Sequence, residues 1–302
     1  MKYTFLLPAF KARFIEEALG SILAQTYSEF EVIVSDDCSP EDLKSIVDKF
    51  ADPRVTYRRN ERNIGAEHLV DHWNLLLGLT DAEYIIMASD DDVYDPRYLE
   101  EMDKLARKYP EASVLRPMVR RIDAEGKETR RETHYEPTLD VNRFLELWGD
   151  GTLFSGVPYY VFKASVLKEN GGFPNYPYAW FSDDGAVVQS IIGGSYIAIA
   201  EEVLFAFRRS GENISDILQR SKAREQVVAA FLFDGHCLSD GRIGKDAANK
   251  AHVLVYSLVR NTLDATSGGA RYFMRLCLMR LPDRESRRVR RKLLRTIIKE
   301  SL

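Results

Sequence analysis

Residues 83–96 read EYIIMASDDDVYDP, an apolar run that ends in three consecutive aspartates, Asp90, Asp91 and Asp92. A short run of this composition, bounded by polar residues, is typical of a buried β-strand. Adjacent carboxylates repel one another, so their clustering at a strand end needs a reason. Aspartate also favours turns and helix starts, which leaves a plain polar turn as the alternative for the triplet taken alone.

Two further acidic pairs follow the same pattern. Asp36 and Asp37 follow the run FEVIVS, and Asp183 and Asp184 lie in WFSDDGAVV. Acidic clusters at the ends of neighbouring strands would repel unless a cation lies between them. Mg²⁺ and Mn²⁺ prefer carboxylate oxygens and commonly bind one or two carboxylates together with substrate phosphates. The chain has no GxxxxGK[ST] loop and no GxGxxG after its first strand, so we expect a nucleotide-diphosphate site with a divalent metal.

The hydrophobic periodicity of residues 1–120 predicts an α/β fold. Strands are expected at 3–7, 30–35, 54–59, 83–88 and 112–119, and helices at 12–25, 39–50, 66–78 and 97–109. Ser39 is expected to cap the second helix, with Pro40 at its first position. Alternating strands and helices favour a mostly parallel, doubly wound sheet, in which ligands bind at the carboxyl ends of the strands.

The rest of the chain divides into two parts. Residues 121–215 are rich in Gly, Pro and aromatic side chains and are expected to complete the catalytic domain (1–215) with an acceptor-binding half. Residues 216–302 have helical periodicity, and their last part, 271–302, holds 11 Lys and Arg against 3 Asp and Glu. A basic amphipathic tail of this kind could lie on an anionic membrane surface, or pack on the catalytic domain or an oligomer partner.

Composition excludes several classes of protein. The formal net charge of −4 over 302 residues carries no global signature of nucleic-acid binding. Three cysteines without a CxxC pair argue against a disulfide framework or a zinc site and suit a reducing cytoplasm. The sequence has no run of 18 or more apolar residues, so we expect no membrane-spanning helix. We therefore expect a cytoplasmic enzyme, with peripheral contact to the inner face of the membrane through the tail as an open alternative.

Several motifs resemble those of family 2 glycosyltransferases, which have the GT-A fold. They are LLPAF, ALGSILAQTYSEFEVIVSDDCSPE, RNERNIGA, EYIIMASDDDVYDP, GGFP, FSDDG and FRRSGENIS, in that order along residues 1–215. The resemblance implies a GT-A fold with a C-terminal helical extension. It also implies sugar transfer from a nucleotide-diphosphate sugar, with uracil as the expected base. Because the QxxRW motif of processive members is absent, we expect the addition of a single sugar.

The resemblance assigns the donor site residue by residue. Asp37 is expected to accept hydrogen bonds from the base, and Asp90 to lie near the ribose. Asp91 is the expected metal ligand, with Asp92 in support. The other expected nucleotide-binding residues are Pro8, Ala9, Phe10, Asn63 and Gly65. Ser89 stands where the family commonly has the first aspartate of its metal motif.

The resemblance also assigns the catalytic side of the site. Asp184 is the expected catalytic base of an inverting reaction, with Asp183 as its neighbour. Trp180 is a candidate for stacking on a sugar ring, although aromatic side chains more often belong to the core. Many relatives have a histidine that helps to bind metal or phosphate at the position of Ser210. Because Ser210 replaces it here, Arg208 and Arg209 are expected to contact the acceptor or the diphosphate, and the strictness of the metal dependence stays open.

The expected partners are a nucleotide-sugar donor and a saccharide or lipid-linked acceptor, in the synthesis of a bacterial surface polysaccharide or glycolipid. Two alternatives stay open. A nucleotidyltransferase that makes sugar nucleotides also uses acids and magnesium, but it would need a Gly-rich, basic phosphate loop that LLPAFKARF lacks. A catalytically degenerate sugar-nucleotide-binding module would explain Ser89 and Ser210.

Overall fold

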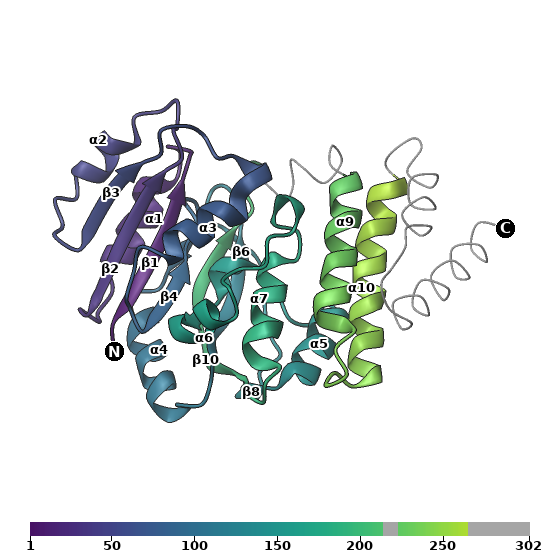
Figure 1. Cartoon of the computed structure of the whole chain (residues 1–302). Helices are drawn as coiled ribbons and strands as arrows, with labels where there is room; N and C mark the ends of the chain where they lie inside the picture. Colours follow the sequence, from purple (N-terminus) through teal and green to yellow (C-terminus); the bar gives the residue numbers. More distant parts are fainter. Residues whose placement is uncertain (214–222, 265–302) are drawn as a thin grey trace.

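A computed structural model describes residues 1–213 and 223–264 (Figure 1). Its first half is a parallel sheet in the order β3-β2-β1-β4. The strands are β1 (Tyr3–Ala9), β2 (Phe30–Asp36), β3 (Val55–Arg59) and β4 (Tyr84–Met87). Every residue of β4 is buried, as its uninterrupted apolar sequence predicts for a strand covered on both faces. β1 runs through Pro8, where we expected it to end, because its pairing with β4 stops at Leu6 and leaves β2 as the only neighbour there.

The second half of the sheet is mixed in direction. β9 (Val161–Lys163) is antiparallel between β4 and β6 (Val114–Ile122), and β10 (Ile197–Arg208) is parallel to β6. Three short strands complete it: β5 (Val93–Tyr94) and β8 (Thr138–Leu139) beside β10, and β7 (Glu128–Arg131) beside β6, all antiparallel. The acidic triplet thus lies between β4, in the parallel half, and β5, in the mixed half.

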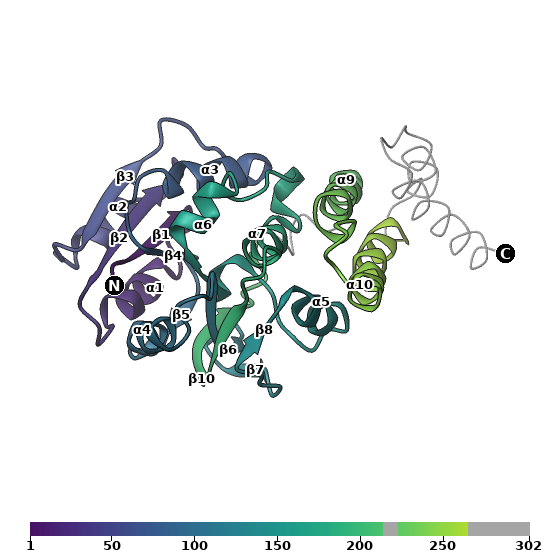
Figure 2. The same ribbon diagram turned by 60° about the horizontal axis from the view of Figure 1, so that its bottom comes forward.

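Helices cover both faces of the sheet. They are α1 (Ile15–Leu23), α2 (Leu43–Asp48), α3 (Leu69–Leu77), α4 (Tyr98–Lys108), α5 (Val141–Gly149), α6 (Ala164–Glu169) and α7 (Ser182–Ile191). Figure 2 shows α3, α6 and α7 on one side of the sheet and α1 and α4 on the other. This doubly wound arrangement is the one that the alternation of strand and helix patterns predicts.

One helix start differs from the sequence prediction. α2 begins at Leu43, and its cap is Asp42, whose side chain accepts a hydrogen bond from the Ser45 backbone N–H at 3.1 Å. Ser39, the predicted cap, instead donates its hydroxyl to the Phe10 carbonyl at 2.6 Å. The predicted cap was wrong because the helix begins four residues later; the Ser39 hydroxyl accepts the Glu41 N–H at 3.1 Å ahead of it.

The two helices expected after residue 216 are present where the structure describes that region. α9 (Ala223–Phe233) and α10 (Lys245–Asp264) lie side by side at the end of the molecule away from β3 (Figure 1). No helix within the described ranges is long and apolar enough to cross a bilayer. The basic tail, residues 271–302, lies outside the described residues, and so does residue 216, at which we expected the helical region to begin.

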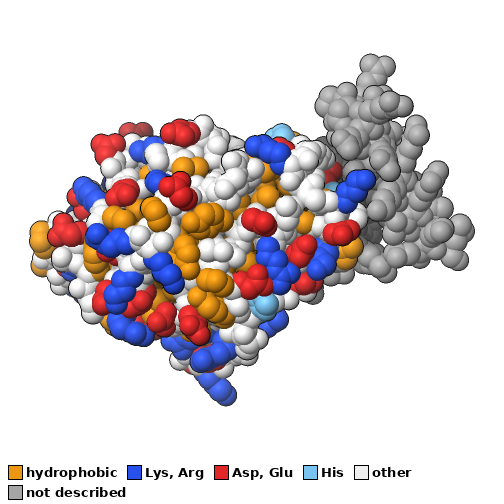
Figure 3. Space-filling view, turned by 90° about the horizontal axis from the view of Figure 1, so that it is seen from below, with side chains coloured by type: hydrophobic (Ala, Val, Ile, Leu, Met, Phe, Trp, Pro, Cys, Tyr) orange, Lys and Arg blue, Asp and Glu red, His pale blue; other side chains and the backbone are white. Residues whose placement is uncertain are grey.

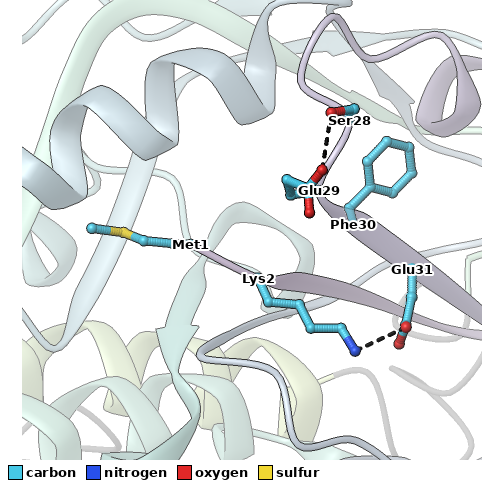
Figure 4. Close-up of a pocket in the computed structure, with 6 residues that line it drawn as sticks. All are labelled: Met1, Lys2, Ser28, Glu29, Phe30 and Glu31. Atoms are coloured by element: carbon cyan, nitrogen blue, oxygen red, sulfur yellow. Dashed lines mark hydrogen bonds and ion pairs between the residues drawn. The ribbon is translucent and has the colours of Figure 1, made fainter.

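A hollow on the surface of the described residues lies away from the acidic clusters. It has a volume of about 390 Å³ and is lined by Met1, Lys2 and Ser28–Glu31, at the amino ends of β1 and β2 (Figure 4). The acidic clusters follow the carboxyl ends of β2 and β4, at the opposite edge of the sheet. On the lower face of the molecule, basic and acidic side chains are interspersed rather than gathered into a field of one sign (Figure 3).

Candidate active site

The three acidic side chains after β4 have different surroundings. Asp90 is tied to the loop after β1, because one of its carboxylate oxygens accepts hydrogen bonds from the backbone N–H groups of Phe10 at 2.9 Å and Lys11 at 3.0 Å. These two bonds partly offset the burial that raises the pKa of Asp90. Asp90 therefore joins the ends of β1 and β4 into one edge.

Asp92 is fully buried and only half satisfied. Its Oδ1 accepts a hydrogen bond from the Arg208 backbone N–H at 2.8 Å, whereas its Oδ2 has no partner among the described residues. Burial, together with the neighbouring Asp91, raises the pKa of Asp92 well above its ordinary value. A buried carboxylate oxygen without a donor calls for a proton or a cation.

Asp91 is partly exposed and has a single side-chain contact, from Asn213 Nδ2 at 3.3 Å. Burial and the adjacent Asp90 raise the pKa of Asp91 to about 7, while the cations Lys11 and Arg208 lower it. No group of three acidic, histidine or cysteine side chains that could hold a metal occurs in residues 1–213 or 223–264. One or two carboxylates are nevertheless enough where substrate phosphates supply the other ligands, so Asp91 and the unpaired oxygen of Asp92 fit a divalent cation.

Asp37 holds the loop of residues 60–65 at the end of β2. Its carboxylate accepts four hydrogen bonds, from Asn60 Nδ2 at 2.9 Å, Asn63 Nδ2 at 3.1 Å, and the backbone N–H groups of Ile64 at 2.8 Å and Gly65 at 2.9 Å. An ionised carboxylate has about four acceptor positions, so the protein alone can fill them. The backbone N–H of Asp37 also donates to the Ala9 carbonyl at 2.8 Å, which joins the ends of β1 and β2.

The other nucleotide-site candidates lie at the ends of the neighbouring strands or in this loop. Ala9 is buried, Pro8 is partly buried, and Phe10 is 41% exposed, so an aromatic ring stands open to solvent beside the strand ends. Gly65 has a φ of 69°, a conformation that favours glycine, and this turn aims its N–H at Asp37. The structure thus brings the predicted donor-site residues together at the carboxyl ends of β1, β2 and β4.

The pair Asp183–Asp184 opens α7 in a second part of the site. Asp184 is buried, and its Oδ1 accepts a hydrogen bond from Ser155 Oγ at 2.5 Å. Ser155 Oγ is also 2.9 Å from the Tyr160 hydroxyl. Burial and the adjacent Asp183 raise the pKa of Asp184 well above its ordinary value, and the Ser155 bond lowers it.

Asp183 is less buried than Asp184 and has different partners. Burial raises the pKa of Asp183 to about 6, against the lowering effect of backbone hydrogen bonds that include one from Val157. The loop at 155–160 therefore supplies a donor to each of the two acids. This loop also approaches the triplet, because Asp92 contributes to the raised pKa of Tyr159, after burial and the opposing effect of Arg121.

A strained turn precedes the acid pair. Tyr178, Ala179 and Phe181 all have φ between 55° and 62°, a region that non-glycine residues rarely adopt. Such strain persists only where the surrounding structure holds it, and it often marks functional sites. Trp180 lies within this turn, packs partly on the core, and has a buried indole N–H without a partner among the described residues.

Arg208 has partners other than the expected diphosphate. Its guanidinium donates to the carbonyls of Asp91 at 2.8 Å and Ala124 at 3.2 Å and to Glu17 Oε2 at 2.6 Å, and the side chain is 1% exposed. Arg208 therefore holds the backbone of the acidic triplet in place. Arg209 donates its backbone N–H to the Ile122 carbonyl at 2.8 Å, and Ser210 forms a turn with Asn213.

Sequence reasoning missed the residues that support Asp184. Ser155 and Tyr160 lie in a Gly- and Pro-rich stretch without a pattern that singles them out. A buried ion pair lies behind them: Arg116 Nη2 is 2.8 Å from Glu132 Oε1, and the same oxygen accepts from the Phe154 N–H at 2.8 Å. The mixed charges within the β6–β7 segment gave no sign that this one pair is internal.

Comparison with known proteins decides the family. The model of the family described as "Glycosyl transferase family 2" matches residues 4–171, more than half of the chain. The chain belongs to glycosyl transferase family 2. This match spans the first two acidic clusters and ends before Asp183 and Asp184. It favours a glycosyl transferase over the nucleotidyltransferase alternative.

Curated relatives of this glycosyl transferase include two bacterial enzymes. One is the putative colanic acid biosynthesis glycosyl transferase WcaA of Escherichia coli K12, 40% identical over 84 residues, or 27% of this chain and 29% of that protein. The other is the poly(ribitol-phosphate) β-N-acetylglucosaminyltransferase TarS of Staphylococcus aureus, 22% identical over 229 residues, or 71% of this chain and 37% of that protein. The matches cover 16% to 37% of the length of the first curated relatives.

Solved structures show the GT-A fold of this glycosyl transferase. S. aureus TarS 1–349 in complex with UDP-GlcNAc has a TM-score of 0.58 at 18% identity, over 88% of this chain and 82% of that one. Mannosyltransferase PcManGT from Pyrobaculum calidifontis, in complex with GDP-Man and Mn²⁺, has a TM-score of 0.60 at 17% identity, over 99% and 80%. At these identities the likeness concerns the fold, which is the GT-A fold with a helical extension that the sequence predicts.

Proposed function

We propose that this glycosyl transferase moves one sugar from a UDP-sugar to an acceptor hydroxyl, with inversion at the anomeric carbon, in the synthesis of a bacterial surface polysaccharide or glycolipid. The carrying observation is the edge at which β1, β2 and β4 end, where hydrogen bonds tie both Asp37 and Asp90 to the end of β1. The printed names of TarS and WcaA, and the UDP and UDP-GlcNAc complexes of TarS, support the donor and the process.

The donor would bind along this edge. The exposed Phe10 ring and Pro8 would cover one side of the base, and the loop of Asn63 and Gly65, held by Asp37, would form the floor of the pocket. Asp90 fixes the backbone between the base pocket and the triplet. A divalent cation, Mn²⁺ or Mg²⁺, held by Asp91 and Asp92 would neutralise the charge that builds on the departing diphosphate.

The acceptor would be activated by Asp184. In this proposal its carboxylate takes the proton from the attacking hydroxyl as the oxygen bonds to the anomeric carbon and the diphosphate leaves from the opposite face. A base with a raised pKa holds that proton better than an ordinary aspartate, and burial supplies the increase. Ser155 acts as a positioning residue because its hydroxyl fixes one carboxylate oxygen and leaves the other for the acceptor. Asp183 is the alternative base, and Trp180 would stack on the sugar.

The experiment is a panel of nucleotide sugars assayed for release of the nucleoside diphosphate, with and without Mn²⁺, together with thermal shift. We expect UDP and at least one UDP-sugar to raise the melting temperature, and the UDP-sugar to be turned over. Asp91→Asn should lose the Mn²⁺-dependent part of the stabilisation by UDP. Asp95→Asn should keep it, because the Asp95 carboxylate already accepts a hydrogen bond from the Arg97 N–H at 2.9 Å, which an amide oxygen can also accept. Stabilisation without turnover would favour the degenerate binding module, and no stabilisation by any nucleotide would refute the donor site.

A further inference from the structure

The hairpin of β6 and β7 places four arginines opposite one another. Its register pairs Arg120 with Arg131 and Arg121 with Arg130. Like charges directly opposite on neighbouring strands destabilise a hairpin, and a guanidinium cannot shed its proton to relieve the repulsion. Each pair therefore needs an anion nearby.

The protein supplies that anion for one pair. Glu128 accepts from Arg131 Nε at 2.6 Å and Nη2 at 2.6 Å, and lies 3.9 Å from Arg120 Nη1. Within residues 1–213 and 223–264, neither Arg121 nor Arg130 forms an ion pair with an acid. The Nε of Arg121 is buried and has no hydrogen-bond partner among those residues. The Arg121–Arg130 pair is thus a place of unmatched positive charge.

One aromatic ring holds both guanidinium groups. Arg121 lies 4.1 Å and Arg130 4.7 Å from the centroid of Phe154, which is 4% exposed. The two cations are therefore within about 9 Å of each other, closer than the Debye length of about 10 Å at 0.1 M salt. Stacking on a ring face leaves the N–H edges of each guanidinium available, and these edges match the oxygens of a phosphate or a carboxylate.

Phe154 also connects this pair to the proposed base. The next residue, Ser155, donates to Asp184, and the Phe154 backbone is itself fixed by Glu132. The ring that both arginines contact therefore belongs to the residue next to the one that fixes Asp184. The pair belongs to the half of the domain that we expect to bind the acceptor.

We propose that Arg121 and Arg130 bind an oxyanion of the acceptor, a phosphate or a carboxylate. This inference rests on the proposed function and adds the chemical class of the acceptor to it. An anionic acceptor relieves the repulsion between the two arginines, and a neutral one leaves it in place.

The test is equilibrium dialysis of radiolabelled inorganic phosphate against the full chain, with UDP and Mg²⁺ at saturation to fill the donor site. We expect Arg130→Ala to bind phosphate roughly tenfold more weakly, as for the loss of one charge-assisted contact. Arg130→Lys, which keeps the charge without the fork, should fall between the two. Arg131→Ala is the matched control, because its guanidinium already pairs with Glu128, and it should bind as the native chain does. Equal phosphate affinity in Arg130→Ala and Arg131→Ala would overturn the proposal.

Competition by methyl glucoside, methyl glucoside 6-phosphate and methyl glucuronide then distinguishes a phosphate from a carboxylate. The 6-phosphate and the glucuronide should displace phosphate more strongly than the neutral glucoside, and the stronger competitor shows which anionic group the acceptor carries. Equal competition by all three would also overturn the proposal. UDP release from the UDP-sugar is measured on the same preparations. Its absence from every variant would refute the transferase function, whereas intact UDP release with no effect of Arg130 would refute this inference alone.

Discussion

Replacing Glu132 by Gln should destabilise the protein strongly, because it breaks a buried ion pair. The side chains of Arg116 and Glu132 are 0% and 1% exposed, and Arg116 Nη2 donates to both carboxylate oxygens, at 2.8 and 2.9 Å. The same carboxylate accepts the backbone N–H groups of Val119 at 2.9 Å and Phe154 at 2.8 Å. Glutamine keeps the shape but leaves the Arg116 charge buried without a counter-charge.

Breaking a buried pair in this way costs about 3–5 kcal/mol of unfolding free energy. In a chain of this size that corresponds to a fall in melting temperature of roughly 10 °C. Urea unfolding followed by circular dichroism gives the free energy directly. The matched control is Glu128→Gln in the same hairpin, whose ion pair with Arg131 is partly exposed to solvent, so that its loss should cost less than the loss of the buried pair. If Glu132→Gln loses no more stability than Glu128→Gln, the buried pair does not hold this part of the fold together.

Three further substitutions address the two parts of the site. Asp184→Asn should lower turnover by about 10²–10⁴-fold, as for the loss of a general base, and leave UDP affinity unchanged. Because burial raises the pKa of Asp184, the folded chain loses stability as the pH rises through that pKa. Asp184→Asn should therefore have a higher melting temperature than the native chain at pH 8, and this difference should disappear towards pH 4. Equal melting temperatures at pH 8 would contradict the burial of a charged carboxylate. The hydrogen bond from Ser155 lowers the pKa of Asp184, so Ser155→Ala should raise that pKa and move the acidic limb of the pH–rate profile to higher pH. Ser155→Thr should keep the native profile. An unshifted limb in Ser155→Ala would contradict the positioning role. Asp37→Asn should weaken UDP binding at least about tenfold in calorimetry, because an amide cannot accept from four donors, and unchanged affinity would show that this pocket does not carry the base.

The sequence predicts the parallel half of the sheet well because its strands are short apolar runs followed by capping residues or carboxylates. It also locates the donor-site candidates, since residues that follow neighbouring parallel strands must meet at one edge. Within the pair Asp36–Asp37 the division of roles also depends on the fold. Asp36 is taken up by Tyr57 and Arg59, both at 2.5 Å, while Asp37 faces the loop of Asn63 and Gly65.

The supports of the site could not be predicted, because each depends on a contact between segments distant in the sequence. Ser155 meets Asp184 across 29 residues, and Arg208 meets Asp91 across 117. An arginine at the end of a strand, beside a second arginine, gives no local sign that its side chain will be buried next to a carboxylate triplet. His72, four residues after His68, has the spacing of a metal pair, but its Nε2 is buried 2.8 Å from Ser35 Oγ, which fits a packing role.

The most direct test of the account is the anomer that forms first when water replaces the acceptor. Hydrolysis of an α-linked UDP-sugar by the native chain, followed by proton NMR before the free sugar equilibrates, should yield the β-anomer, and Asp184→Asn should form it far more slowly. An α-anomer formed first, or a rate unchanged in Asp184→Asn, would contradict inverting transfer by Asp184.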